Sequence, residues 1–595
     1  MAERRGTTDD DVVGKAYDHQ LAMRLLAYTR PYARWVALAI VVLFLTSLLD
    51  LAGPYLTKIA IDEHIARRDL SGLGRIALLY LAVVVGGFAL EYLQFYVMQW
   101  VGQRIVFDLR VQVLRHLHRQ ELAFFDRNPV GRLMTRVTSD IQALHELFTT
   151  GVVAIFGDFV TLIGIIVVMF VLDWRLALVA NIVLPVLLAI SMLFRSRVRA
   201  SYRDIRSRVA AMNSFLQEHI TGMRVVQIFG HEGGSRRRFD GLNSAHRDAQ
   251  LRTVLYYALF FPAVEIVSAV ATGLILWFGG GRIVQNALEF GVLVAFMQYA
   301  ERFFRPISDL SEKYNTFQAA MASSERIFKL LDRQPAIHSR RGARRLERAR
   351  GHIVFENVRF AYDPDEPVLH DLSFEVQPGE RLALVGATGA GKTSILSVLT
   401  RLYEIQGGRV LLDGIDVRDL DVQDLRRQVG VVLQDVFLFA GDIERNIRLG
   451  ETRITSEQVR RAAQLVSADR FIDKLPQGYA AEVTERGSTL SVGQRQLLAL
   501  SRVLAFDPAI LVLDEATSSI DTETEILIRA ALHRLLEGRT ALVVAHRLST
   551  IQDCDRILVL HRGRLRESGT HAELLGQRGL YARLHELQFR DENAA

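Results

Sequence analysis

The chain has 595 residues, too many for one compact domain, so its length predicts several domains. Half of the residues are apolar, the mean hydropathy is +0.16, and the apolar residues are concentrated before about residue 310. The net charge of +6 is almost wholly due to arginines beside apolar segments, without the basic, aromatic-rich face of a nucleic-acid-binding protein, and the single Cys554 excludes intramolecular disulfides and cysteine-based metal clusters. The first twenty residues lack the apolar core of a signal peptide, so they are expected to stay in the cytoplasm.

Six stretches are long and apolar enough to cross a bilayer as helices, which takes about 20 residues each. They are roughly residues 35–57, 76–101, 147–172, 176–194, 253–280 and 287–309. The sixth is the weakest, because Glu301, Arg302 and Arg305 interrupt its end. Buried helices of a large soluble protein are a poor alternative, since Ile155–Leu172 holds a single charge.

The distribution of arginine predicts the orientation of these spans. Loops 102–146 and 195–252 carry seven and twelve arginines, whereas the turns 173–175 and 281–286 carry one each. The two long loops are therefore expected in the cytoplasm, and with six spans both termini are expected there too. The outer loop 58–75 weakens the rule without reversing it, because three acids accompany its four basic residues.

The two long loops contain helices of their own. Arg104–Glu121 and Ser201–Gln217 have helical periodicity and lack proline, which predicts helices that continue out of the membrane. Glycine or proline breaks each hairpin at its far end, within Phe124–Met134 and within Glu218–Val226. Each break is either a simple turn or a docking element, and the two interpretations are compatible.

Four acidic residues lie within the predicted spans. They are Asp50, Glu91, Asp158 and Glu265. A charge at bilayer depth costs roughly 2.5–3.5 kcal/mol on insertion scales, so it usually faces a cavity or a partner. Two interpretations stay open: an acidic lining that favours cationic or zwitterionic amphiphiles, and hydrogen bonding between helices or a position near an interface.

Residues 332–350 are polar, basic and nearly free of large apolar side chains, which predicts a linker. We expect a solvated tether, although its basic run could touch anionic lipid headgroups. From Ile353 the pattern changes to short strands, typical of an α/β domain. The predicted organisation is a cytoplasmic tail at 1–20, a membrane domain at 21–331, the linker at 332–350 and a nucleotide-binding domain at 351–590.

A strand at Arg381–Val385 runs into a glycine-rich loop and then into the apolar helix Ser394–Leu402, which is the context of a phosphate-binding loop. Glycines let backbone N–H groups wrap phosphate oxygens, and the helix N-terminus favours negative charge. Lys392 is expected to reach the β- and γ-phosphates, and Thr393 to supply a hydroxyl to Mg²⁺. The predicted nucleotide-contacting residues are Gly386, Ala387, Thr388, Gly389, Ala390, Gly391, Lys392, Thr393 and Ser394.

The apolar strand Ala509–Leu513 ends in two acids, Asp514 and Glu515. Ligands of parallel sheets bind at the carboxyl ends of the strands, so Asp514 is placed to bind Mg²⁺ and Glu515 to polarise the attacking water as general base. The alternative interpretation is that the two acids only cap the next turn. It does not explain why the same chain also carries a phosphate-binding loop.

The segment Leu490-Ser491-Val492-Gly493-Gln494 closely resembles the LSGGQ signature of ATP-binding cassette (ABC) proteins. From about residue 20 to 590 the chain resembles a half-transporter of the ABC exporter superfamily, related to bacterial multidrug exporters and lipid flippases. The resemblance implies an α-helical six-span transmembrane domain with long cytoplasmic helix extensions, followed by an α/β P-loop ATP-binding cassette. It also implies that the breaks in the long loops are coupling helices, which meet an X-loop at Thr484–Gly487 on the cassette.

The same resemblance assigns four further residues of the nucleotide site. Tyr362 resembles the A-loop aromatic that stacks on adenine, and Gln434 resembles the Q-loop glutamine near Mg²⁺, with a part in catalysis. Asp521 resembles the D-loop aspartate, and His546 resembles the switch histidine that contacts the γ-phosphate. With Lys392 and Glu515, Gln434 and His546 form the expected catalytic set.

The resemblance further implies a dimer, because each ATP lies between the phosphate loop of one cassette and the signature of the other. Ser491 and the backbone N–H groups of Gly493 and Gln494 are expected to contact the partner's ATP. Val492 stands where the family usually has glycine; its side chain, and its poor fit to a positive φ, are expected to weaken this signature. The intact catalytic residues then predict the catalytic half of a heterodimer, and a homodimer that tolerates Val492 is the alternative.

Together these features predict ATP-driven export or flipping of amphipathic drugs or lipids across the cytoplasmic membrane of a bacterium, with ATP and Mg²⁺ as cofactors. The expected partners are a second half-transporter, membrane lipid and an amphipathic substrate, with no nucleic acid. An ATP-gated channel or regulator on the same scaffold is the competing hypothesis. An importer is disfavoured, because importers generally carry the two domains on separate chains.

Overall fold

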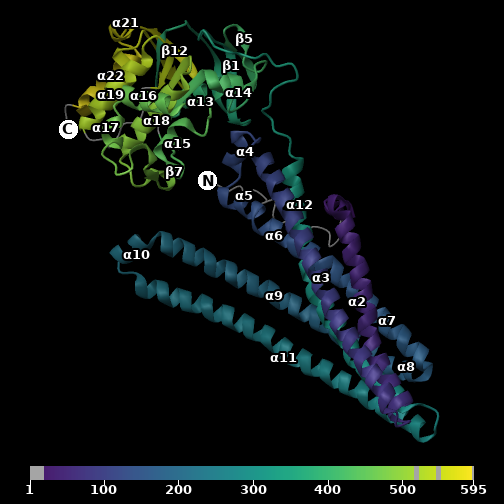
Figure 1. The fold of residues 1–595 in the computed structure, drawn as a ribbon. Coiled ribbons are helices and arrows are strands. Elements are labelled where there is room, and N and C mark those ends of the chain that lie inside the picture. Colours follow the sequence, from purple (N-terminus) through teal and green to yellow (C-terminus); the bar gives the residue numbers. More distant parts are fainter. Residues whose placement is uncertain (1–18, 434, 515–521, 545–550, 593–595) are drawn as a thin grey trace. The chain divides into compact units, whose positions relative to one another are not determined.

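The computed structural model describes residues 19–433, 435–514, 522–544 and 551–592 (Figure 1). It divides into two compact units. The first holds the chain up to His116 together with Gly131–Arg333, and the second combines Leu117–Val130 with the chain from Gln334 onward. A short piece of the N-terminal half therefore belongs to the same unit as the C-terminal half.

The first unit is built from helices. Its helices are α1 (His19–Ala27), α2 (Ala33–Ile59), α3 (Leu70–Leu117), α5 (Val130–Val137), α6 (Ser139–Glu146), α7 (Val152–Leu172), α8 (Trp174–Asn181), α9 (Leu184–Thr221), α10 (Met223–Ile228), α11 (Glu232–Val284) and α12 (Phe290–Asp332). Among the described residues, five stretches are long and apolar enough to cross a membrane: Arg30–Ile65, Leu70–Leu117, Ile155–Leu172, Trp174–Thr221 and Glu232–Val284. They contain the first, second, fourth and fifth predicted spans and the residues from Ile155 onward of the third, and the weaker sixth lies in α12, which is not among the five.

Long helices continue well beyond the apolar stretches, as predicted. Helix α3 runs on to Leu117, and α9 runs on to Thr221. The far ends break as expected: Pro129 lies between α4 (Leu122–Arg127) and α5, and Gly222 separates α9 from α10. Helices α9 and α11 run side by side, with α10 at their far end (Figure 1).

The turns that were predicted to face outward contact one another. A guanidinium nitrogen of Arg282 lies 2.5 Å from the carboxylate of Asp173, which joins the turn before α8 to the end of α11. The Gly291 N–H donates to the Asp62 carboxylate at 2.6 Å. These contacts bring the turns after α2, α7 and α11 together at one end of the unit.

A proline inside α2 creates a backbone acceptor that α12 satisfies. Pro54 has no N–H, so the carbonyl of Asp50, four residues earlier, loses its usual helical donor. The guanidinium of Arg302 donates to this carbonyl, and the Tyr299 hydroxyl donates to the next one, Leu51, at 2.6 Å. Because lipid offers no donors, these two side chains make the break in α2 tolerable.

The four membrane acids do not share one environment. Asp158 in α7 forms an ion pair with Lys313 in α12, so pairing between helices is the interpretation that applies to it. Asp50, Glu91 and Glu265 are exposed on the surface of this chain.

The second unit is an α/β domain with two main sheets. A six-stranded sheet has the order β12-β11-β3-β10-β9-β6, and a four-stranded antiparallel sheet has the order β2-β1-β4-β5. The strands of the six-stranded sheet are β3 (Arg381–Val385), β6 (Val429–Val432), β9 (Ile510–Asp514), β10 (Thr540–Val544), β11 (Arg556–His561) and β12 (Arg564–Gly569), all parallel except β12 at the edge. The other strands are β1 (Ile353–Asp363), β2 (Glu366–Val376), β4 (Gly407–Leu412), β5 (Ile415–Asp416), β7 (Gly441–Asp442) and β8 (Glu482–Val483).

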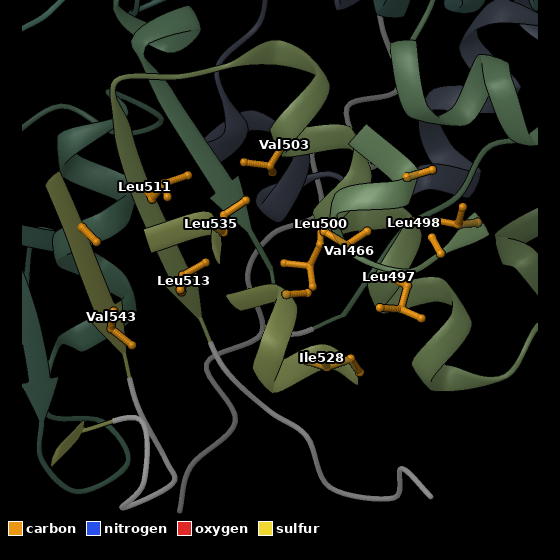
Figure 2. Packing of buried hydrophobic residues seen from close by; sticks show 14 of the residues in the cluster. Val466, Leu497, Leu498, Leu500, Val503, Leu511, Leu513, Ile528, Leu535 and Val543 are labelled. Atoms are coloured by element: carbon orange, nitrogen blue, oxygen red, sulfur yellow. The ribbon is translucent and has the colours of Figure 1, made fainter. Parts of the chain in front are cut away.

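Helices cover this sheet, and its core lies on both faces. The helices are α13 (Lys392–Leu399), α14 (Val422–Gln428), α15 (Ile443–Arg448), α16 (Ser456–Leu465), α17 (Asp469–Ile472), α18 (Val492–Phe506), α19 (Thr522–Leu536), α21 (His571–Gly576) and α22 (Leu580–Glu592). On β9, Leu511 and Leu513 pack with α18 and α19 (Figure 2), whereas Ile510 and Val512 pack toward the antiparallel sheet. This alternation buries both faces of the predicted strand and confirms its assignment as a central parallel strand.

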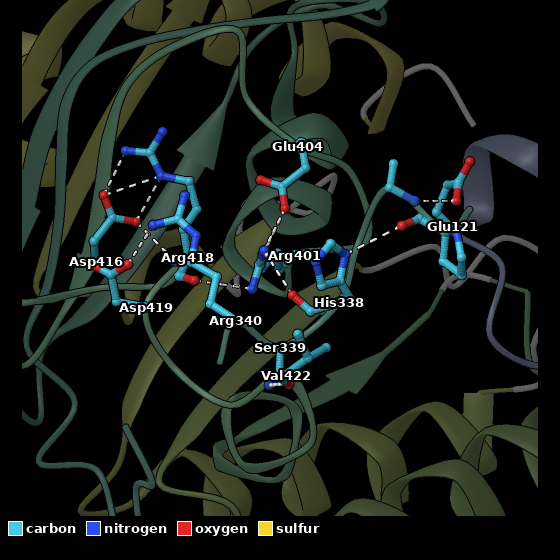
Figure 3. A network of polar contacts seen from close by, with 12 residues as sticks. Glu121, His338, Ser339, Arg340, Arg401, Glu404, Asp416, Arg418, Asp419 and Val422 are labelled. Atoms are coloured by element: carbon cyan, nitrogen blue, oxygen red, sulfur yellow. Dashed lines mark hydrogen bonds and ion pairs between the residues drawn. The ribbon is translucent and has the colours of Figure 1, made fainter. Parts of the chain in front are cut away.

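The segment predicted as a solvated tether is instead attached to the second unit. Arg340 forms an ion pair with Asp419 at 2.6 Å (Figure 3). The Ser339 hydroxyl donates to Asp421 at 2.9 Å. Further on, the Ala349 N–H donates to the Gln428 side chain at 2.9 Å. The segment is largely exposed, and these contacts hold it along the domain that follows.

We predict that Arg302→Met destabilises the first unit, because it leaves the Asp50 carbonyl without its donor at a cost of about 1–3 kcal/mol. Pro54→Ala restores the helical donor to the Asp50 carbonyl. Arg302→Met should therefore destabilise the Pro54→Ala variant by at least ~1 kcal/mol less than it destabilises the wild type, and a double-mutant cycle measures this coupling. Thermal unfolding of the purified protein in detergent gives the four values. The neighbouring Glu301→Gln serves as control, and additive effects of Arg302→Met and Pro54→Ala would contradict the explanation.

Candidate functional site

The predicted phosphate-binding loop joins β3 to α13, in the strand–loop–helix arrangement expected. Gly391 caps α13 with a φ of +99°, in the left-handed region that favours glycine. A Cβ atom on Gly386 would lie 2.4 Å from the carbonyl oxygen of Leu560 in β11, so only glycine allows this close approach. The middle of the loop, from Ala387 to Gly389, is exposed, which leaves its backbone open to a ligand.

Lys392 is buried at the first position of α13 and its side chain folds over the loop. The ammonium donates to the carbonyl oxygens of Gly386 at 2.6 Å and Ala387 at 3.2 Å. Burial lowers the pKa of Lys392, and the negative charge of Asp514 acts against that shift. A buried cation above a glycine-rich loop and a helix N-terminus is a setting that favours a phosphate group.

The metal ligands predicted from two distant segments lie next to each other. The Thr393 hydroxyl donates to the Asp514 carboxylate at 3.3 Å, across the carboxyl ends of the parallel strands. A hydroxyl and a carboxylate are the oxygen ligands that Mg²⁺ takes beside substrate phosphates. The two residues therefore fit a magnesium ion, with room in its coordination shell for phosphate oxygens and water.

Tyr362 lies at the end of β1, where its hydroxyl is 3.1 Å from the hydroxyl of Ser394 in the first turns of α13. The residue is 42% exposed, and its ring stands edge-on to the rings of Phe360 and Tyr403, with centroids 4.8 and 5.0 Å away. These contacts fix the ring plane and leave part of the ring accessible, as stacking on a base requires. Ser394 itself is buried, and its hydroxyl contacts the hydroxyl of Tyr362.

Helix α4, from the N-terminal half of the sequence, is bound beside this aromatic cluster within the second unit. The Tyr403 hydroxyl donates to the Asp126 carboxylate, and Arg127 donates to the Tyr362 carbonyl at 3.2 Å. Burial, followed by the bond to Asp126, raises the pKa of Tyr403, so its hydroxyl remains a donor. Glu121, just before α4, accepts from the Ala336 N–H at 3.0 Å (Figure 3).

The signature segment forms the start of α18. Ser491 is the N-cap residue: its hydroxyl accepts from the Gln494 N–H at 3.2 Å, and the Gln494 side chain accepts from the Ser491 N–H at 3.0 Å. This capping box occupies two of the groups that were expected to bind phosphate. Gly493 is buried in the first turn, and Val492 is 39% exposed.

One part of the reasoning about Val492 is overturned. Val492 is the first residue of α18 and is not among the residues with positive φ, so its backbone suits a β-branched residue. The nearby left-handed residues are Arg486 and Gly487, at φ +58° and +63°. Only the exposed side chain of Val492 can therefore weaken the signature.

Three side chains that the sequence did not single out hold these loops in place. Arg495 donates to the carbonyls of Leu490 at 2.7 Å and Gly487 at 3.3 Å, which braces the signature from within α18. Buried Asn446 exchanges two 2.8 Å hydrogen bonds with the backbone of Phe439, and Arg502 donates to the Asn446 carbonyl at 2.9 Å. Polar residues in helices carry no sequence signal for such contacts, because their partners are backbone groups of distant loops.

Four predicted site residues lie outside the described part of the chain. They are Gln434, Glu515, Asp521 and His546. The roles assigned to them remain predictions. The structure does bring together the phosphate-binding loop, Asp514 and Tyr362, through β1, β3, β9 and α13.

Two protein-family descriptions match the chain. Residues 36–307 match the ABC transporter transmembrane region, and residues 369–518 match ABC transporter, the family of the ATP-binding domain. An uncharacterized ABC transporter ATP-binding protein of Bacillus subtilis, YknV, is 40% identical over 594 residues, covering 99% of this chain and 98% of its own length. An ATP-dependent lipid A-core flippase of Syntrophus aciditrophicus is 36% identical and covers 95% of this chain and 94% of its own length.

A solved structure is also similar along most of the chain. It is a bacterial Atm1-family ABC exporter with ATP bound, 30% identical, with a TM-score of 0.78. The match covers 93% of this chain and 98% of that one. Both the helical unit and the α/β unit are therefore shared with this exporter.

We predict that Thr393→Ala lowers ATP hydrolysis by roughly 10–100-fold, because it removes one of the three predicted magnesium ligands, Thr393, Gln434 and Asp514. Thr393→Ser keeps the hydroxyl and should retain most of the activity. Hydrolysis measured against Mg²⁺ concentration tests this, and the alanine variant should require far more Mg²⁺ while still binding ATP. An unchanged Mg²⁺ requirement would exclude Thr393 as a ligand.

Proposed function

Because the chain belongs to the ABC transporter family, with a transmembrane region and an ATP-binding cassette in one polypeptide, we propose that it is one half of an exporter of amphipathic drugs or lipids. It is a membrane protein whose cassette binds ATP and couples ATP hydrolysis to transport. The observation that carries the proposal is the attachment of α4 beside Tyr362, because it links the nucleotide site to the hairpin of the helical unit. The lipid A-core flippase among the relatives supports an amphipathic substrate.

The chemistry rests on the carboxyl edge of the six-stranded sheet. Lys392 and the glycine-rich loop hold the β- and γ-phosphates, and Tyr362 stacks on the adenine. Thr393 and Asp514 would hold Mg²⁺, which would supply positive charge beside the transferred phosphate. We assign to Glu515, the next residue after Asp514, the proton of the attacking water, to Gln434 a role near Mg²⁺ and to His546 the contact with the γ-phosphate.

A change at the nucleotide site can reach the membrane through α4. Adenine on Tyr362 presses against a ring that touches Tyr403, and Tyr403 is bonded to Asp126 in α4. Arg127 also binds the Tyr362 backbone, so α4 contacts both the ring support and the main chain of this residue. In this way the state of the cassette biases the two conformations of the helical unit.

The proposed exporter is a dimer, because the α10 tip and the signature at Ser491 are assigned to contacts with a second chain. ABC exporters work as dimers, and here the tip at α10 is apolar and exposed: Ile220, Val225, Ile228 and Phe229 are each at least 60% exposed. The α4 tip is covered by the cassette of its own chain, whereas α10 belongs to the other unit. We assign α10 to the partner's cassette, and the signature at Ser491 to the partner's ATP, since exposed apolar patches mark interaction sites.

The partner is proposed to be a different chain. The Val492 side chain projects at the start of α18, where the family signature has only backbone, so it obstructs the partner's phosphate by its bulk. The chain's own Lys392, Asp514, Glu515 and His546 keep the catalytic residue types. The ATP site built on this chain is therefore proposed to hydrolyse fast, and the ATP site on the partner, completed by this chain's weak signature, to hydrolyse slowly. A homodimer that tolerates Val492 is the alternative.

The proposed location is the cytoplasmic membrane of a bacterium. The arginine-rich loops that contain α4 and α10, both termini and the cassette lie in the cytoplasm, where ATP is available. The joined turns around Asp173 and Asp62 then lie on the outer side.

We predict that Tyr403→Phe lowers transport per ATP by about threefold or more while ATP hydrolysis stays within twofold, because only the bond to Asp126 is lost. Reconstituted vesicles allow both rates to be measured on one sample. Glu515→Gln is the matched control: it should nearly abolish hydrolysis and transport while leaving ATP binding intact. Unchanged coupling in Tyr403→Phe would refute the role of α4, and substrate passage through Glu515→Gln would favour the ATP-gated channel.

We predict that this chain expressed alone lacks the substrate-stimulated ATPase of the complete dimer. Val492→Gly should raise hydrolysis at the partner's site by roughly 3–10-fold, because it removes the bulk at the signature while Ser491 keeps its cap. Val492→Ala, with a smaller side chain, should be intermediate. A stable homodimer with full activity, insensitive to both substitutions, would establish the homodimer instead.

A further inference from the structure

An aromatic cluster joins the start of α2 to α3, and the nucleotide cycle does not use it. The centroid of the Trp100 ring in α3 lies 5.4 Å from that of Trp35 in α2 and 6.1 Å from that of Tyr32, the residue before α2. The Tyr32 hydroxyl donates to the Asp108 carboxylate at 2.7 Å, about two turns beyond Trp100 along α3. These contacts hold the beginning of α2 beside the second half of α3.

The length of the apolar part of α3 places this cluster at one edge of the membrane. Trp100 is 25 residues beyond Arg75, and the only charged residue between them is Glu91. Such a length of helix spans about 38 Å, whereas the hydrocarbon core is about 30 Å thick and the bilayer with its headgroups about 40–45 Å. Trp100 therefore lies near the headgroups of the leaflet on the side of the arginine-rich loops. Trp35, which contacts Trp100, lies at the same level, where tryptophan is enriched in membrane proteins.

Two arginines lie at this headgroup level. The guanidinium carbon of Arg104 is 5.3 Å from the centroid of the Trp100 ring, and Arg34 directly precedes Trp35. Both arginines are exposed, and neither forms an ion pair with a residue that the structure describes. Two positive charges are therefore available to a ligand from the surrounding membrane.

The helix face that carries Arg34 continues into the membrane as an exposed apolar stripe. Leu38, Val41 and Leu45 follow Arg34 at four, seven and eleven residues, so they lie on the same face of α2. All three are exposed, at 37%, 56% and 44%. A cation at headgroup level above an apolar stripe matches the two parts of a phospholipid, and this arrangement favours a lipid over a soluble anion.

The charge of the site restricts which phospholipid fits it. A guanidinium binds phosphate through paired N–H donors, and each arginine near a membrane surface strengthens the binding of anionic lipid about fivefold. A zwitterionic headgroup brings an ammonium group, which two arginines repel, whereas an anionic headgroup brings none. Asp108, one turn beyond Arg104, carries one charge against two and already accepts from Tyr32.

We infer that Arg34 and Arg104 bind the phosphate of an anionic phospholipid in the cytoplasmic leaflet. The Trp100 ring supports Arg104, and the stripe from Leu38 to Leu45 contacts the acyl chains. The lipid is a resident ligand of the helical unit and not the exported molecule, so the site goes beyond the proposed function and does not depend on the identity of the substrate.

Brominated lipids test this inference, because bromine quenches the fluorescence of a tryptophan that it contacts. The dimer is prepared with Trp174→Phe/Trp277→Phe in this chain, which leaves Trp35 and Trp100 as its tryptophans. It is reconstituted in phosphatidylcholine with increasing amounts of brominated phosphatidylglycerol or of brominated phosphatidylcholine with the same acyl chains. We expect the anionic lipid to reach half-maximal quenching at a mole fraction roughly 10–25-fold lower. Tryptophans of the partner contribute equally to every variant, so differences between variants report on this site.

The variants assign the preference to the two arginines. Arg34→Gln and Arg104→Gln should each lower it about fivefold, and the double variant should abolish it. Arg104→Lys keeps the charge and should retain most of the preference. Arg110→Gln removes an exposed arginine of the same helix, about 9 Å further from the membrane, and should leave both the preference and ATP hydrolysis unchanged. ATP hydrolysis by each variant reports that it is folded.

Equal quenching by the two lipids in the starting protein, or an unchanged preference in Arg34→Gln/Arg104→Gln, would overturn the inference. An equal loss in Arg110→Gln would show that only the overall positive charge attracts lipid, and would overturn the assignment to these two residues. Relief of quenching by soluble glycerol phosphate would replace the lipid with a soluble anion and would overturn it as well. None of these measurements involves transport, so a failed export assay would refute the proposed function and leave the lipid site standing.

Discussion

The carboxyl edge of the parallel sheet is the constraint on which the nucleotide site depends. There the loop after β3 must turn tightly enough to present its backbone, which the left-handed Gly391 and the close approach of Gly386 to β11 allow. The sheet register then sets Asp514, at the end of β9, beside Thr393 in α13. Since both faces of β9 are buried, the strand cannot slip without unpacking two cores, and so the position of these ligands is held firmly.

The same site is connected to a segment far away in the sequence. Arg127 and Tyr362 are 235 residues apart, and Asp126 and Tyr403 are 277 apart, yet both pairs are hydrogen-bonded within one unit. The aromatic rings around Tyr362 serve two purposes, because the packing that orients the ring for a base also carries the bond to α4. In the proposed function, nucleotide binding and movement of the helical hairpin therefore depend on the same few side chains.

The helical unit follows the general requirement that polar groups in an apolar setting need partners. Pro54 frees a carbonyl, and Arg302 from α12 satisfies it. Asp158 carries a charge, and Lys313 from α12 neutralises it. Because α12 leads directly into the segment that precedes the cassette, the helix that pairs with Asp158 is also the one closest in sequence to the nucleotide-binding unit.

Sequence alone determined the features that depend on local order. The spans, the broken hairpin ends, the phosphate-binding loop and the strand ending at Asp514 follow from apolar periodicity and from glycine at fixed offsets, which act over a few residues. The contacts of the linker could not be predicted from the sequence, because its basic residues meet acids such as Asp419 only in the folded domain. The size of the Val492 side chain follows from the sequence, but its backbone φ could not be predicted. That φ depends on where α18 begins, which the cap at Ser491 sets.

Tertiary structure decided which distant groups meet. Nothing in the order of residues pairs Asp158 with Lys313, Tyr403 with Asp126, or Arg495 with the carbonyl of Leu490. Each of these contacts joins a charged or polar side chain to a partner whose position depends on how whole helices and sheets pack. The motifs of the sequence therefore predicted the chemistry of this protein. The contacts of α4 and the charge pair between α7 and α12 exist only in the folded chain, because they are set by packing between elements and not by local sequence.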